Sequence, residues 1–148
     1  MIDSYIPSSS DRVRDQVARY EASNGADGGT LEGRPVVILT TVGGRTGAIR
    51  KNPVIRIPHG DNYIAVASNA GAANHPGWYR NLTAHPDVWV QDGAVKRRLR
   101  AREVFGEEKT RMWAIAEQHW PHFPEYRVNA GSREIPVLVL EPVTNEGS

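Results

Sequence analysis

The chain has 148 residues, a formal net charge of +1, and hydrophobic and charged fractions of 39% and 24%. These values are ordinary for one globular domain with its own core, and they argue against a surface built throughout for nucleic acid, which is usually strongly basic. The absence of cysteine excludes disulfides, thiolate metal sites and cysteine nucleophiles. No apolar run approaches the roughly 20 residues that cross a bilayer, and no secretory signal is evident, so a cytoplasmic protein is expected.

Residues 1–29 are expected to hold one short helix and a flexible loop. Val13, Val17 and Tyr20 share one face of that helix, and the glycine-rich residues 23–33 offer little that could pack. The expected role of the helix is docking on the rest of the domain. Dimerisation and peripheral contact with a membrane surface are the alternatives.

Short β-branched runs predict about six antiparallel strands between residues 30 and 142. Turn residues separate them, and the first two-thirds of the chain lacks the long helices that a parallel sheet requires. We therefore expect a mainly β (α+β) domain, a small closed or half-closed β-barrel in meander order with peripheral helices, and a polar tail at 143–148. The expected strands are residues 35–41, 53–57, 63–67, 86–91, 94–105 and 135–140, and the later helices are a short one from Pro76 and one at 106–119.

The first two of these strands are joined by the stretch Gly43 to Pro53, which reads GGRTGAIRKNP and holds three glycines and three cations. Its backbone N–H groups, together with Arg45, Arg50 and Lys51, suit a phosphate or a carboxylate. Taken alone, the stretch is equally compatible with a solvated hairpin whose cations keep a sheet edge soluble.

The strand at 94–105 carries Lys96, Arg98, Arg100 and Arg102 on one face. A solvated basic outer face is favoured over a ligand groove for this strand. Binding of single-stranded nucleic acid on this face, beside Trp89, is the least favoured functional hypothesis.

Familiar catalytic motifs are missing from the sequence. The glycines at 43–47 match neither the P-loop nor the dinucleotide fingerprint, and there is no Gly-x-Ser-x-Gly elbow. His119 and His122 are separated by a helix-breaking Trp-Pro pair, so no metal site is predicted. A small-residue loop at 68–75 beside aromatic and cationic segments fits a protein whose bound cofactor carries the chemistry.

Four segments in order, 31–41, 43–53, 67–82 and 133–142, give the chain its resemblance to a known family. The sequence resembles the deazaflavin (coenzyme F420)-dependent nitroreductases of actinobacteria over roughly residues 29–142. The resemblance implies a split β-barrel, similar to the FMN-binding split barrels, that binds F420 over residues 30–142, with FMN as the less expected cofactor. It implies hydride transfer from reduced F420 to a quinone, nitroaromatic or activated enone. A non-catalytic F420- or flavin-binding module is the alternative.

The resemblance also implies a site. Ser68 is expected to be the first and Tyr126 the second candidate for a catalytic hydrogen-bond donor, and Trp120, Phe123 and Tyr126 are expected to form a substrate wall. The expected partners are a small-molecule electron acceptor and, at most, a second copy of the chain, with no nucleic acid. The expected cofactor-binding residues are Arg45, Thr46, Arg50, Lys51, Asn52, Pro53, Ala67, Ser68, Asn69, Ala70, Gly71, Asn74, Pro76, Gly77 and Trp78.

Overall fold

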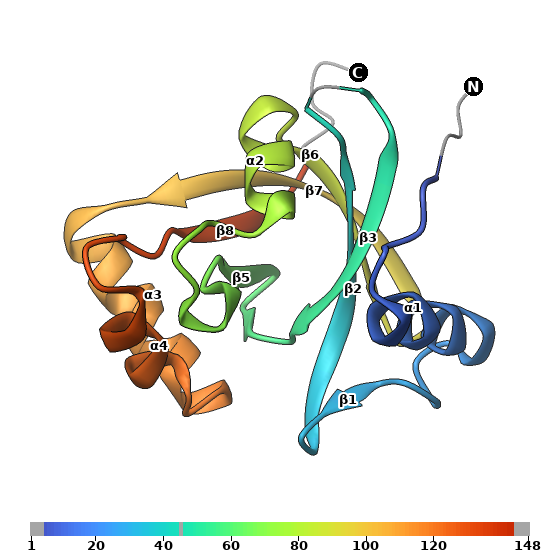
Figure 1. Cartoon of the computed structure of the whole chain (residues 1–148), viewed down its shortest axis with the longest axis horizontal. Helices are drawn as coiled ribbons and strands as arrows, with labels where there is room; N and C mark the ends of the chain where they lie inside the picture. Colours follow the sequence, from blue (N-terminus) through green and yellow to red (C-terminus); the bar gives the residue numbers. More distant parts are fainter. Residues whose placement is uncertain (1–4, 45, 144–148) are drawn as a thin grey trace.

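A computed structural model describes residues 5–44 and 46–143 of the chain. Its centre is an eight-stranded antiparallel sheet that curls into a half-barrel, with helices around it (Figure 1). Along the sheet the strands run in the order β1-β2-β6-β7-β8-β5-β4, and β3 pairs with β2 away from this path. The split-barrel prediction is therefore confirmed.

The helices are α1 (Asp11–Ser23), α2 (Gly77–Ala84), α3 (Gly106–His119) and α4 (Phe123–Ala130), and η1 (Asn69–Gly71) is a single 3₁₀ turn. The strands are β1 (Thr30–Leu31), β2 (Arg34–Val42), β3 (Ile49–Ile55), β4 (Pro58–His59), β5 (Asn62–Val66), β6 (Asp87–Asp92), β7 (Val95–Val104) and β8 (Val137–Pro142).

The six longer strands correspond to the six that the sequence predicts, but their expected meander order is wrong. The last strand, β8, lies between β7 and β5, and β5 does not pair with β3. The reason is visible in the burial of β8, in which Val137, Leu138, Val139 and Leu140 are each at most 2% exposed. A strand with apolar side chains on both faces is stable only where other parts of the protein cover both faces of the sheet. The middle of the sheet provides that cover, and β8 lies there.

Proline at position 136 does not interrupt this central strand because it directly precedes it. Its carbonyl oxygen accepts the N–H of Ala67 at 2.9 Å, which ties the end of β5 to the start of β8. The missing N–H of proline therefore costs the ladder nothing.

Three apolar clusters cover the sheet. One lies under α3 and α4 around Trp113, a second lies beneath α2 around Leu82, and the third joins α1 to β2. In the third cluster Tyr20 is 2% exposed, and its Oη accepts the N–H of Gly93 at 2.7 Å. The helix α1 thus docks on the sheet, and no helix within the described residues is long and apolar enough to span a membrane.

Four elements were not predicted from the sequence: α4, β1, β4 and the 3₁₀ turn η1, which lies in the expected small-residue loop. The segment around Tyr126 forms the helix α4, which starts beside Pro124, a residue that is well suited to a first helical turn. The two-residue strands β1 and β4 fall where only loop or turn was expected. Two residues are too few to show the alternation that identifies a strand in a sequence, and whether they pair depends on their neighbours in the fold.

Candidate functional site

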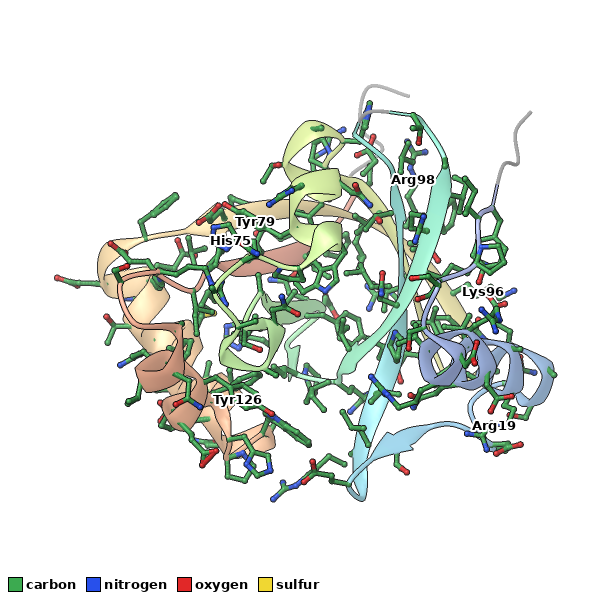
Figure 2. All side chains as sticks on the ribbon, in the orientation of Figure 1. Arg19, His75, Tyr79, Lys96, Arg98 and Tyr126 are labelled. Carbon is green, nitrogen blue, oxygen red and sulfur yellow. The ribbon has the colours of Figure 1, made fainter. Side chains whose placement is uncertain are left out.

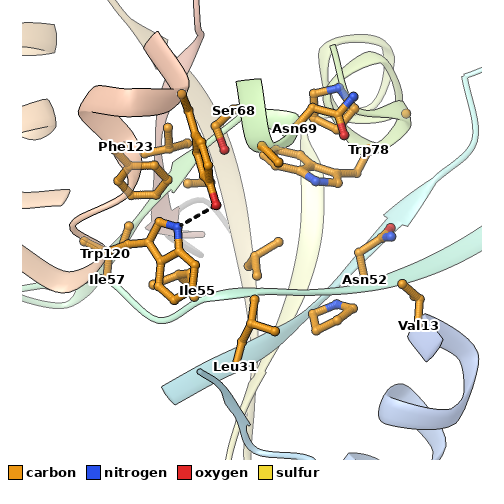
Figure 3. Close-up of a pocket in the computed structure, with 18 of the residues that line it drawn as sticks. Val13, Leu31, Asn52, Ile55, Ile57, Ser68, Asn69, Trp78, Trp120 and Phe123 are labelled. Carbon is orange, nitrogen blue, oxygen red and sulfur yellow. Dashed lines mark hydrogen bonds between the residues drawn. The ribbon is translucent and has the colours of Figure 1, made fainter. Parts of the chain in front are cut away.

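A cavity of about 420 Å³ opens where the sheet is split, between the edge of β3 and the end of β5 (Figure 3). This volume lies within the range of roughly 300–1,000 Å³ that is usual for small-molecule and cofactor sites. Its walls come from β3, from the β5–α2 connection, from the aromatic residues around α4, and from α1 with β1. Segments far apart in sequence therefore meet at one site.

The β5–α2 connection contributes a strained turn to this cavity. Asn69 and Ala70 both have left-handed backbone conformations, with φ of 49° and 54°, and both line the cavity. The side chain of Asn69 donates to the carbonyl oxygen of Asn74 at 2.9 Å, which closes the connection on itself. Left-handed conformations in residues other than glycine concentrate at functional sites, because the surrounding structure must hold them.

Gly71 ends the turn and fits tightly against α4. Its φ is +81°, and a Cβ there would lie 2.9 Å from Cβ of Asn129 and 3.0 Å from the carbonyl oxygen of Tyr126. Only glycine fits this contact without a shift of α4. The turn and the helix that carries Tyr126 are thus placed relative to each other by direct backbone contact.

The opposite wall is aromatic. Trp120 and Phe123 are each 3% exposed and belong to the core under α3 and α4, while one surface of each lines the cavity. The indole Nε1–H of Trp120 donates to Oη of Tyr126 at 3.3 Å, shown as a dashed line in Figure 3. Trp120 and Phe123 therefore belong to the core and line the cavity at the same time.

Ser68 lies at the end of β5 and is 8% exposed, with its side chain lining the cavity (Figure 3). Trp78 also lines the cavity, in the first turn of α2, next to Gly77 and Pro76. The first backbone N–H groups of a helix have no partner within the helix, so this end of α2 offers donors at the cavity wall.

The cations of the β2–β3 hairpin separate onto two faces. Lys51 donates to Oε2 of Glu21 at 2.6 Å, and its ammonium lies 4.7 Å from the ring centre of Tyr5, on the α1 side. Side chains alternate along a strand, so Arg50 lies on the other face of β3, together with Asn52 and Val54. Val54 packs with the cluster beneath α2, which identifies this face as the α2 side. The predicted residue Arg45 lies outside the described residues.

Eleven of the predicted site residues line the cavity together, and six others do not. The lining residues are Asn52, Pro53, Ser68, Asn69, Ala70, Pro76, Gly77, Trp78, Trp120, Phe123 and Tyr126. The residues near the cavity or along the hairpin that do not line it are Thr46, Arg50, Lys51, Ala67, Gly71 and Asn74. Of these, Thr46 accepts the N–H of Ala48 through Oγ1 at 3.1 Å, inside the hairpin.

Sequence reasoning missed the contribution of α1 and β1 to the cavity. Arg12, Val13 and Gln16 of α1 and Leu31 of β1 line it. The amphipathic pattern of the helix indicated that it docks, but no local signal indicates which part of the sheet it docks on. Arg12 places a cation at the cavity, and no pattern in the sequence selects it.

Behind the α2 wall lies a chain of polar contacts that was also missed. The hydroxyl of Tyr79 donates to Oε1 of Glu103 at 2.6 Å, and the rings of Tyr79 and His75 lie 4.8 Å apart (Figure 2). Burial, followed by the hydrogen bond to Glu103, raises the pKa of Tyr79 to about 12. Burial, followed by the charges of Arg133 and Arg80, lowers the pKa of His75, while Glu103 opposes that shift.

The basic face of β7 is largely paired with carboxylates. Arg98 and Arg100 lie 3.7 and 3.0 Å from oxygens of Asp87, and Arg102 lies 3.0 Å from Glu108 and 3.2 Å from Glu141. These pairs neutralise most of the positive charge that a nucleic acid would require. The hypothesis of nucleic-acid binding on this face loses its main support.

A half-barrel with a cavity at its split, lined by backbone, aromatic rings and polar side chains, defines a cofactor-binding protein of the split-barrel class. The family model for F420H2-dependent quinone reductases matches residues 12–142. The chain belongs to this family. It is an F420H2-dependent oxidoreductase, and its cofactor is coenzyme F420.

Individual relatives agree with this assignment. The chain is 34% identical, over 133 residues and 87% of each chain, to an F420H2-dependent quinone reductase of Mycobacterium tuberculosis. It is similar to a solved F420H2-dependent reductase with 39% identity and a TM-score of 0.68, over 73% of this chain and 95% of the other. A solved structure described as a domain-swapped dimer has 38% identity and a TM-score of 0.70, over 86% and 96% of the two chains.

The residues at the cavity fit a flat, polycyclic cofactor. The strained turn brings backbone close to the cavity with only the small side chains of Ser68, Asn69 and Ala70. At Gly77, a Cβ would meet no atom within 4 Å, so this part of the wall leaves open space beside the backbone. Backbone amides and open space at a wall suit the polar edge of a planar ring system.

Proposed function

We propose that this reductase transfers its electrons to a quinone that lies in the same cavity as the deazaflavin ring. The observation that carries the proposal is the division of one cavity into two unlike walls. The β5–α2 connection supplies backbone and the start of α2, and the opposite side supplies Trp120, Phe123 and Tyr126. The family description and the named relatives, which are quinone reductases, support the choice of acceptor.

In the proposed arrangement, the backbone of Ala67–Gly71 and the start of α2 hold the ring of the cofactor. The backbone N–H groups of Gly77 and Trp78, which directly follow Pro76, offer helix N-terminal donors to its polar edge. Arg50, which shares a face of β3 with Asn52, continues this side of the strand toward the hairpin. A guanidinium there suits the phosphate and glutamate carboxylates of the F420 tail. Arg12, unlike Arg50, lines the cavity itself and places a further cation there.

Reduced F420 supplies a hydride from its C5 when bound. The task of the protein is to orient the acceptor, exclude water and hydrogen-bond the quinone oxygen on which negative charge develops. Hydride addition plus one proton converts the quinone to its hydroquinone, so two electrons and two hydrogens are accounted for. Ser68 and Tyr126 are the hydroxyl donors at the cavity for that oxygen.

Tyr126 is well placed for this role because its oxygen already accepts the indole N–H of Trp120. A phenol whose oxygen accepts a hydrogen bond is left with its own hydrogen to donate. Trp120 and Phe123 provide flat apolar surfaces against which a quinone ring can stack.

The proposal is tested by titration followed by turnover. F420 and FMN are titrated against the protein with cofactor fluorescence as the signal, and oxidation of reduced F420 is then followed with a soluble benzoquinone and, separately, a nitroaromatic compound. We expect saturable binding of F420, weaker binding of FMN, and faster oxidation by the quinone. Tighter binding of FMN would contradict the cofactor-site assignment. Oxidation by the nitroaromatic alone would contradict the quinone assignment.

A further inference from the structure

Arg133 lies in the connection between α4 and β8 and reaches the back of the β5–α2 connection. Its Nε donates to the carbonyl oxygen of Ala72 at 2.9 Å, and NH2 donates to that of Ser68 at 2.6 Å. NH1 donates to the carbonyl oxygen of Ala67 at 3.2 Å and contacts Nδ1 of His75 at 2.9 Å. Four of the five N–H groups of a guanidinium are thus used on one loop.

These contacts bracket the strained turn. Ala67 and Ser68 precede it, Ala72 follows it, and the left-handed residues Asn69 and Ala70 lie between them. Two consecutive left-handed residues cost energy that neighbouring contacts must offset. The rigid fork of an arginine fixes several acceptors at once, which a lysine ammonium on a flexible stem does not do. Arg133 therefore holds the turn in the shape that it presents to the cavity.

The contact with His75 also fixes the protonation of that ring. Arginine donates hydrogen bonds and accepts none, so Nδ1 of His75 must be the acceptor and carries no proton. The neutral ring then has its hydrogen on Nε2. The charged groups around the ring are Arg133, Arg80 and Glu103. Burial, followed by the charges of the two arginines, lowers the pKa of His75 and so favours its neutral form.

His75 is itself part of the cavity wall, directly before Pro76. A neutral imidazole with hydrogen on Nε2 is a donor and suits a carbonyl or anionic oxygen at that wall. It differs from the hydroxyl donors Ser68 and Tyr126 because a second residue selects its donor nitrogen.

We propose that Arg133 is a positioning residue for the cofactor: it sets the shape of the Ser68–Gly71 turn and fixes His75 as an Nε2–H donor to an oxygen of the bound ligand. This inference rests on the proposed function in assuming that the turn holds F420. The tautomer of His75 does not depend on that assumption, because it follows from Arg133 alone.

The first test uses the wild-type protein without cofactor, labelled with ¹⁵N at histidine. Long-range ¹H–¹⁵N spectra at neutral pH distinguish the two neutral tautomers and the charged ring. We expect His75 to be neutral with hydrogen on Nε2. A hydrogen on Nδ1, or a charged ring, would overturn the role assigned to Arg133, whatever cofactor the protein binds.

The second test measures affinity for F420 in Arg133→Lys and in the matched control Arg127→Lys. Arg127 lies in α4, just before the connection that holds Arg133, and its guanidinium stacks on the ring of Trp113, 4.2 Å from the ring centre. We expect Arg133→Lys to weaken F420 binding about tenfold to a hundredfold, because several hydrogen bonds from a charged donor are lost together. Arg127→Lys is expected to leave the affinity within about twofold.

The third test concerns the donor nitrogen of His75. In His75→Gln the side-chain amide replaces Nε2–H as a donor, whereas His75→Phe keeps a ring and removes the donor. We expect F420 affinity to be retained largely in the first variant and lost by about tenfold in the second. Equal affinities in Arg133→Lys and Arg127→Lys, or in the two His75 variants, would overturn the inference. Failure of the wild-type protein to bind F420 would instead overturn the proposed function.

Discussion

The indole Nε1–H of Trp120 donates to the hydroxyl oxygen of Tyr126 across 3.3 Å, from the start of the α3–α4 connection to the middle of α4. Trp120 is 3% exposed and is held by the core, so it restricts the position of a tyrosine that is only partly buried. The phenol hydrogen remains available to a ligand. Tyr126 therefore combines a fixed oxygen with a free donor at the cavity.

Replacing Tyr126 by phenylalanine removes this donor and keeps the ring. We expect kcat for quinone reduction to fall by about tenfold to a hundredfold, because removal of one preorganised donor typically costs that much or more. F420 affinity is expected to remain within about twofold, since a hydroxyl that serves the acceptor adds nothing to cofactor binding. Stopped-flow oxidation of bound reduced F420 measures the first quantity, and fluorescence titration measures the second.

Ser68→Ala is the matched comparison for that variant, because it removes the other candidate hydroxyl at the cavity. If Tyr126 is the donor, the serine variant retains most of the wild-type rate. A large loss in Ser68→Ala together with an unchanged rate in Tyr126→Phe would assign the role to Ser68. Little change in either variant would exclude both as the donor.

Gly71→Ala tests the contact between the η1 turn and α4. An alanine with a left-handed backbone conformation lowers the free energy of unfolding by about 1–2 kcal/mol, and the shift of α4 that its Cβ forces lowers it by about 1–3 kcal/mol more. The control is Gly60→Ala, because Gly60 has φ +61° but no atom within 4 Å of a Cβ. We expect the Gly71 variant to lose more unfolding free energy than the control in urea denaturation, and to lose F420 affinity as well. Equal losses in the two variants would mean that the tight contact has no energetic effect.

The long strands, and eleven of the residues that line the cavity, could be picked out from the sequence because both carry local signals. The run 137–140 is apolar at every position, and the small residues 67–71 together with Pro76 mark a close backbone approach. The order of the sheet could not be read in the same way. Insertion of β8 between β7 and β5 depends on which faces are covered, and that is a property of the whole fold.

The same limit applies at the site. Arg12 becomes a cavity residue because α1 docks on the sheet. His75 belongs to a loop that Arg133 contacts from 61 residues further along the chain, measured to Ala72. A guanidinium that bonds three carbonyl oxygens leaves no spacing pattern, since its acceptors are backbone atoms that every residue has. Such partners become visible only in the folded chain.

Arg50 and Lys51 are neighbours with different expected roles. Arg50→Ala should weaken F420 binding about tenfold and reduce its dependence on salt concentration, because a cation for the anionic tail is lost. Lys51→Ala should leave F420 affinity unchanged and lower the free energy of unfolding by no more than about 1 kcal/mol, the usual size for a partly exposed ion pair. Titrations at two salt concentrations and urea denaturation measure these effects. The reverse pattern would place the cofactor tail on the α1 side of β3.

The raised pKa of Tyr79 predicts a loss of stability at alkaline pH. Its neutral hydroxyl donates to Glu103, and its pKa of about 12 lies above the ordinary value of about 10. The stabilisation is therefore complete below pH 10 or so and is lost as pH rises through the folded-state value. The matched control is Tyr79→Phe, which keeps the ring beside His75. Urea denaturation at about pH 9 should find the wild type more stable than this variant by about 1 kcal/mol, and the difference should shrink toward pH 12. A difference that stays constant or grows with pH would show that the hydrogen bond to Glu103 does not hold the phenol neutral.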